Sequence, residues 1–256
     1  DVQKAVNPAE RVYYPVADNK EPIVAIGTDK EVDDPSIEVY FKQDATPDSE
    51  KNNVGYLASQ YMTSMITSML NARLSELTQS ANPPFTRAYS SYGNFFVAKT
   101  KEALNLSASS KADGIEKALK VLLQEAERAR RFGFTESEYA RARANYLQRL
   151  ESAYNEREKT KHGSYVREYV RNFLDAEPIP GIETEYAMMN QLAPNLPVQA
   201  INMAIQQLVP DSNQVVIIAG PEKEGLKYPQ KEEVIALLKG MKSLDLQPYV
   251  DKVSDE

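Results

Sequence analysis

The sequence predicts an α+β fold in which a mostly antiparallel sheet is covered by several helices. Strand-like segments occur in neighbouring pairs, and strands that follow one another closely usually pair antiparallel. Longer segments between and after them carry apolar residues at helical spacing. The predicted order is β-β-α-β-β-α-α-α-α-β-α, without an internal repeat.

The first two strands are expected near the start of the chain. Residues 22–27, PIVAIG, form a short apolar run. Residues 36–43 alternate the apolar side chains of Ile37, Val39 and Phe41 with polar ones. This alternation is typical of a strand with one face buried.

A long helix is predicted for residues 46–79. Pro47 suits its first turn, and nearby acidic side chains complement the helix dipole. Met62, Met65 and Met69 form a stripe that is compatible with either an adaptable binding surface or core packing. We interpret the stripe as part of the core.

Two further strands, 85–99 and 102–109, are expected to precede an amphipathic helix at 111–134. The next predicted helix, 135–173, begins with TESE, a capping box with Thr at the N-cap and Glu three residues later. We expect a bend in this long, charged helix at Gly163.

The last third of the chain is expected to add three helices and one strand. The helices are predicted at 183–194, 197–210 and 231–241, and a buried strand is predicted at 213–222. A chain of 256 residues is long enough to bury a large core without disulfides or a structural metal.

Domain boundaries follow from composition. Residues 1–20 are polar with two prolines and are interpreted as an incoming linker. Residues 21–241 are expected to form a single α/β unit, and residues 242–256 an outgoing linker. Because the chain begins at Asp1 without a Met, we expect it to be part of a longer protein.

Charge and hydropathy argue against two classes of partner. The net charge is −7 and the pI about 5.1, whereas a nucleic-acid surface needs a basic field. The basic cluster at 127–134 is interpreted as a solvated helix face. No run of about 18 apolar residues exists, so we expect no membrane span.

The donor set for catalysis is small. The chain has no cysteine and one histidine, His162, whereas a catalytic zinc helix needs two imidazoles one turn apart. His162 lies among charged residues and is expected to face solvent. No G-x-S-x-G elbow and no phosphate-binding glycine loop occurs. A pair of carboxylates remains open as a catalytic device, but the sequence singles out none of the 37 acidic residues.

Three segments in order resemble the pitrilysin/insulinase family of zinc metallopeptidases. They are SMLNARLSEL at 68–77, FTRAYSSYG at 85–93 and RFGFTESEYARARANYLQRL at 131–150. The family pattern is matched by the following residues: Ala72, Arg73, Leu74, Ala88, Tyr89, Gly133, Thr135 and Glu138. The similarity covers roughly residues 22–225.

Two catalytic motifs of the family are missing or incomplete, and this indicates which unit of the family the chain resembles. The zinc motif His-x-x-Glu-His is absent. The family's Arg seven residues before a Tyr is also incomplete, because Asn82 precedes Tyr89 at that spacing. The resemblance therefore implies a non-catalytic α/β unit, the second of the N-terminal half of a large bacterial member, with no catalytic residue and no metal ligand of its own.

What the resemblance implies about partners follows from that position. Zinc is expected in the neighbouring unit of the full-length protein, and the partners are expected to be that unit, the C-terminal half of the same polypeptide and a peptide substrate. Tyr89 and Tyr92 are the candidate substrate-facing residues. Family resemblance alone favours a periplasmic location.

Two alternatives remain open at this stage. One is a catalytically inactive homologue that acts as an assembly scaffold or binding subunit. The other is a self-sufficient hydrolase that uses carboxylates. A His-x-x-Glu-His segment upstream of Asp1 would separate the main interpretation from the scaffold.

Overall fold

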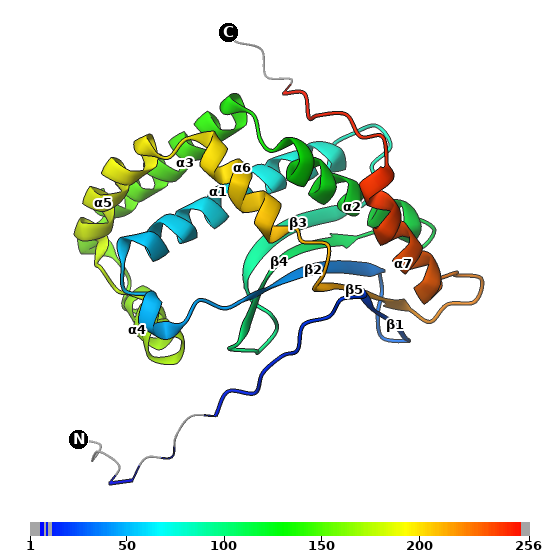
Figure 1. Cartoon of the computed structure of the whole chain (residues 1–256), viewed down its shortest axis with the longest axis horizontal. Helices are drawn as coiled ribbons and strands as arrows, with labels where there is room; N and C mark the ends of the chain where they lie inside the picture. Colours follow the sequence, from blue (N-terminus) through cyan, green and yellow to red (C-terminus); the bar gives the residue numbers. More distant parts are fainter. Residues whose placement is uncertain (1–5, 8, 10–11, 252–256) are drawn as a thin grey trace.

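The computed structural model describes residues 6–7, 9 and 12–251. Figure 1 shows a layer of helices on one face of a five-stranded sheet, with the described N-terminal segment approaching from the other face. The strand order is β1-β5-β2-β4-β3. Strand β1 is parallel to β5, and the pairs β5–β2, β2–β4 and β4–β3 are antiparallel. The predicted mostly antiparallel α+β fold is confirmed.

The structure contains five strands and seven α-helices in its described residues, and several bounds differ from the expected ones. The strands are β1 (Ile23–Asp29), β2 (Ser36–Asp44), β3 (Arg87–Asn94), β4 (Lys101–Ser109) and β5 (Gln214–Pro221). The helices are α1 (Val54–Thr78), α2 (Ile115–Phe132), α3 (Glu136–Asn155), α4 (His162–Asp175), α5 (Ile182–Asn195), α6 (Val198–Leu208) and α7 (Lys231–Gly240). Short 3₁₀ turns cover residues 48–50, 157–159 and 241–243.

The core lies between the sheet and the helices. In β2, Ile37, Val39 and Phe41 are buried, and their β4 neighbours include Leu104 and Leu106. The methionine stripe of α1 also belongs to this core, where Met65 and Met69 are buried. The interpretation of the stripe as core packing is therefore confirmed.

The start of α1 differs from the prediction. Residues 48–50 form a 3₁₀ turn, and the α-helix begins only at Val54. The side chain of Asn53 sets this start, because its Oδ1 accepts a hydrogen bond from the Tyr56 N–H at 2.9 Å.

The single helix expected at 135–173 is wrong. Helix α3 ends at Asn155, and α4 begins at His162, before Gly163, where a bend was expected. Residues 156–162, EREKTKH, contain no apolar side chain, so a continuous helix would bury nothing at this point. The capping box at the start of α3 is confirmed.

Described residues just before β1 lie against this unit. Lys101 Nζ, on β4, is 2.5 Å from both Asp18 Oδ1 and Asp44 Oδ1. Lys42 Nζ donates to the Ala17 carbonyl at 2.8 Å. Ala17 and Asp18 are therefore held by two buried lysines of the sheet.

The basic cluster at 127–134 is not simply a solvated face. Arg130 and Arg131 both pair with the buried carboxylate of Glu127. Arg131 also donates to the carbonyl of Leu244 at 2.8 Å. Arg131 thus anchors the segment that follows α7, whereas Arg130 pairs with Glu127 and lies 3.9 Å from Asp211. Both charges are paired within the domain.

Replacing Gly133 by Ala tests the connection between α2 and α3. Gly133 has φ +70°, and a Cβ there would lie within 2.5 Å of the Asn202 side chain, which binds the Phe134 backbone. We expect Gly133→Ala to lower the free energy of unfolding by about 2 kcal/mol or more. Gly27→Ala is the matched control, because its Cβ would meet no atom within 4 Å. Equal urea midpoints for the two variants would contradict this account.

Candidate functional site

The two candidate tyrosines of β3 lie on opposite faces of the sheet. Side chains alternate along a strand, and positions 89 and 92 differ by an odd number. Tyr89 pairs with Ser107 on the face away from the helices and is 47% exposed. Tyr92 pairs with Leu104 on the helical face, and its hydroxyl donates to Glu102 Oε2 at 2.8 Å. Burial and the Glu102 carboxylate both raise the pKa of Tyr92.

The face away from the helices, here called the open face, carries a hollow of about 280 Å³ over β2, β4 and β3. Its lining includes Ala103, with a methyl side chain, and Gly93, with none, which leaves room above the strands. Aromatic residues, one carboxylate and polar groups complete the lining: Tyr40, Tyr89, Tyr92, Phe96, Glu38, Ser91, Asn94 and Asn105. Tyr92 contributes from the strand edge, since its hydroxyl binds Glu102 on the helical face. In the described part of the chain no helix covers this face (Figure 1).

Polar contacts give this open-face hollow a defined chemistry. The Tyr40 hydroxyl donates to Glu38 Oε2. Burial, that hydrogen bond and the Glu38 charge raise the pKa of Tyr40, so the phenol keeps its proton. Asn105 lines the hollow with 9% exposure, and its Nδ2 has no hydrogen-bond partner among the described residues.

The structure offers no metal centre in the residues that it describes. Within them no group of three or more His, Cys, Asp and Glu side chains is placed to hold a metal ion. His162 is exposed at the first position of α4, as predicted. No helix among these residues is long and apolar enough to cross a membrane.

Buried ion pairing connects the segments that resemble the metallopeptidase family. Arg73, on α1, donates from Nε and Nη2 to the two carboxylate oxygens of Glu138, on α3, at 2.7 and 2.8 Å. The two side chains are 1% and 4% exposed. Arg73 Nη2 also donates to the Gly133 carbonyl at 3.0 Å. Glu138 additionally accepts from the backbone N–H of Thr135 at 2.8 Å, which closes the capping box.

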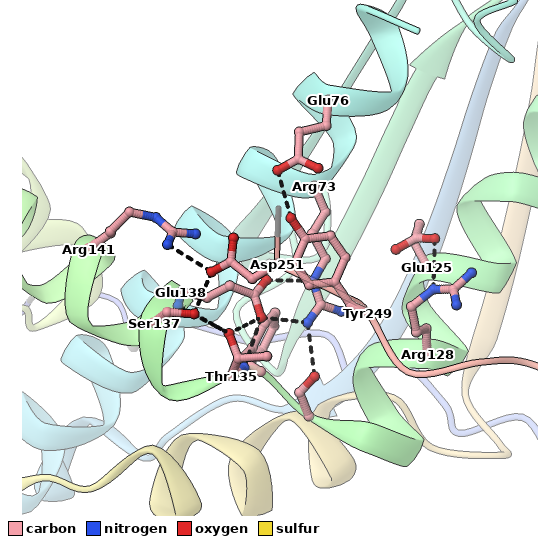
Figure 2. A network of polar contacts seen from close by, with 12 residues as sticks. Arg73, Glu76, Glu125, Arg128, Thr135, Ser137, Glu138, Arg141, Tyr249 and Asp251 are labelled. Carbon is pink, nitrogen blue, oxygen red and sulfur yellow. Dashed lines mark hydrogen bonds and ion pairs between the residues drawn. The ribbon is translucent and has the colours of Figure 1, made fainter. Parts of the chain in front are cut away.

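Figure 2 shows how the C-terminal segment covers this pair. The ring centroid of Tyr249 lies 4.3 Å from the Arg73 guanidinium carbon, and the Tyr249 hydroxyl donates to Glu76 Oε1 at 2.7 Å. Asp251 accepts from Ser137 and lies 2.7 Å from Arg141 Nη1. Residues expected to be an outgoing linker therefore close the Arg73 site.

A family model described as the peptidase M16 inactive domain matches residues 1–146, more than half of the chain. The chain belongs to the peptidase M16 inactive domain family. The resemblance to pitrilysin/insulinase metallopeptidases is thereby confirmed, as is the assignment to a non-catalytic domain.

Relatives of this M16 domain are much longer than the chain itself. A zinc protease PQQL-like protein of Arabidopsis thaliana is 25% identical over 208 residues, which cover 81% of the chain and 18% of the plant protein. The chain thus spans about a fifth of that relative's length.

Solved structures share the fold. The first half of the periplasmic protease PqqL of Escherichia coli superposes with a TM-score of 0.83 at 20% identity, and the match covers 96% of the chain and 52% of that half. The structure of the Escherichia coli protease itself gives a TM-score of 0.85 at 19% identity, with 98% of the chain and 27% of the protease covered.

The motif residues found by sequence thus divide into two groups. Arg73, Thr135 and Glu138 form the buried polar junction, whereas Tyr89 lies on the open face. Sequence analysis missed Glu38 and Asn105. Glu38 of β2 pairs with Ser107 of β4, and Asn105 pairs with Tyr40, so the two residues lie diagonally across neighbouring strands. The polar positions of the alternating β2 segment were the signal that could have indicated Glu38.

Removal of one partner of the buried ion pair should destabilise the M16 domain severely. We expect Arg73→Leu to lower the free energy of unfolding by about 3–5 kcal/mol, because the Glu138 carboxylate would stay buried without its cation. Urea denaturation measures the change. Arg171→Leu is the control, since its pair with Glu177 is exposed and should contribute about 0–1 kcal/mol. Similar losses in the two variants would refute this assignment.

Proposed function

We propose that the chain is the non-catalytic structural and substrate-enclosing domain of a zinc-dependent metalloendopeptidase that degrades peptides. The membership in the M16 inactive domain family carries the proposal. The donor set agrees with it, because one histidine and no cysteine cannot supply the ligands of a catalytic zinc.

Zinc would be held by the neighbouring unit of the full-length polypeptide, where it activates water for attack on the peptide carbonyl. The chain spans about half of the solved half-protease, which leaves room for another unit of similar size. We propose residues 21–241 as one α/β unit, with the flanking segments as connections to its neighbours. A periplasmic location is supported by the Escherichia coli relative, which is described as periplasmic.

The open face is proposed as the wall that meets the peptide. It combines a hollow, exposed aromatic side chains and a carboxylate, and no described helix occupies it. Of the two tyrosines predicted to face substrate, Tyr89 is on this wall. Tyr92 is on the helical side and is proposed to support the strand through Glu102.

Helix α4 is proposed as the contact surface for the other α/β unit of the same polypeptide. Val166, Tyr169, Val170 and Phe173 recur at helical spacing and are 48–75% exposed. All of α4 is described, and none of its residues is buried within the chain. An apolar stripe of this kind normally packs against another element, and a second unit in the same chain is the nearest one available.

Kinetics of the full-length protein test the substrate-facing role of Tyr89. We expect Tyr89→Ala to raise KM for peptides about three- to tenfold, because an aromatic contact contributes about 0.5–1.5 kcal/mol. The value of kcat and the zinc content should not change. Tyr92→Phe is the control: it should lose about 1 kcal/mol of stability but keep KM. An unchanged KM in Tyr89→Ala would remove this residue from the wall.

Charge placed on α4 tests its contact with the other unit. We expect Val166→Glu together with Tyr169→Glu to shift the unfolding free energy of the isolated chain by no more than about 0.5 kcal/mol, because both side chains are exposed. In the full-length protein the same change should reduce peptidase activity and open the junction to limited proteolysis. Arg167→Gln on the same helix is the control. Normal activity and protease resistance would refute the contact.

A further inference from the structure

We propose that the open-face hollow is a subsite for the cationic side chain, Arg or Lys, of a bound peptide. The inference rests on the proposed substrate-enclosing function and adds the chemistry of the residue that is recognised. Three features of the hollow support the inference: its carboxylate, its aromatic rings and an amide without a hydrogen-bond partner. A fourth is that the adjacent strand edge is already occupied.

The carboxylate of Glu38 supplies the charge. Its Oε2 accepts from Tyr40, but an ionised carboxylate has two oxygens and about four acceptor positions. The nearby cation Lys42 has other partners on this face. It donates to the Ala17 carbonyl and lies 5.6 Å from the Phe95 ring centroid. Arg87, two positions from Tyr89, is exposed at the start of β3. The hollow itself is lined by one acidic and no basic side chain among the described residues.

Aromatic rings supply the walls. The ring centroids of Tyr40 and Phe96 are 5.1 Å apart, and Tyr89 also lines the hollow. Phe96 has φ 53°, an unusual backbone angle for a large side chain, and the residue is 56% exposed. Exposed aromatic faces beside a carboxylate attract guanidinium and ammonium groups through cation–π contacts.

An unpartnered amide indicates that the hollow is incomplete without a ligand. Asn105 is about nine-tenths buried in the lining, and its Nδ2 has no hydrogen-bond partner within the described chain. A buried donor without a partner costs free energy, which an acceptor such as a peptide carbonyl would recover. Tyr89, which is 47% exposed, lines the same hollow as Asn105.

The edge of β3 next to the hollow is already hydrogen-bonded, which leaves the open face as the surface available to a peptide. Asn71, on α1, already pairs with the backbone of Ser90: its Oδ1 accepts from the N–H at 2.6 Å and its Nδ2 donates to the carbonyl at 3.1 Å. A peptide therefore cannot add to β3 at Ser90 as another strand without displacing Asn71. The open face, by contrast, presents its hollow without such a block.

Binding of capped pentapeptides to the 256-residue chain tests the proposal. The probes are Ala-Ala-Arg-Ala-Ala and the same peptide with citrulline, which keeps the shape of arginine without its charge. We expect the arginine peptide to bind about fivefold more tightly and to shift the NMR signals of Glu38, Tyr40 and Asn105. Glu38→Gln should abolish the difference between the peptides. Glu232→Gln, which removes the same charge from exposed α7, should preserve it.

The outcomes separate this inference from the proposed function. If Tyr89→Ala weakens both peptides while Glu38→Gln leaves their ratio unchanged, the cationic subsite is wrong and the substrate-facing wall stands. If neither peptide perturbs the hollow, the subsite is wrong as well. Loss of the ratio in Glu38→Gln, with an unchanged thermal melting curve, supports it.

Discussion

The fold depends on a buried ion pair that joins distant segments of the chain. Arg73 and Glu138 are 65 residues apart, and their side chains are nearly inaccessible to water. A buried charge pair is tolerated only when its remaining donors and acceptors are satisfied. The Gly133 carbonyl and the Thr135 N–H satisfy most of these groups. Arg73 Nη1 has no hydrogen-bond partner among the described residues, and the rings of Phe134 and Tyr249 lie against the guanidinium group. The pair therefore sets how α1 meets α3, with the C-terminal segment as its cover (Figure 2).

This junction explains why the family pattern is concentrated where it is. The small-residue, Arg and Leu stretch of α1 and the Gly and Thr-x-x-Glu stretch before α3 are far apart in sequence, but they meet at one point. Gly133 provides a left-handed backbone at the junction. These residues hold the helices of a non-catalytic domain in place, so a strong motif here reports architecture and not chemistry.

The two faces of the sheet differ in composition and in what covers them. The helical face is filled by the apolar residues of β2, β4 and β5, so it supplies stability. The open face has small and polar residues with aromatic rings around a hollow, so it is free to meet a ligand. Helix α4 adds a third surface at the edge of the domain, with apolar side chains that the described chain does not bury. These surfaces are the basis of the proposal that the domain forms a wall between a neighbouring unit and a substrate.

Sequence alone determined the α+β class, the core faces of β2 and α1, the capping box and the shortage of metal ligands, because periodicity, caps and donor counts are local properties. It did not determine that 135–173 divides into two helices, because burial decides whether a polar stretch stays helical. Tyr89 and Tyr92 are three residues apart in one expected strand, so alternation alone puts them on opposite faces. Only the tertiary structure decides which of them faces the helices, because that depends on the side from which the helices pack. Glu38, Asn105 and Tyr89 come together only because β4 lies between β2 and β3, and strand order arises from tertiary packing that no local pattern encodes.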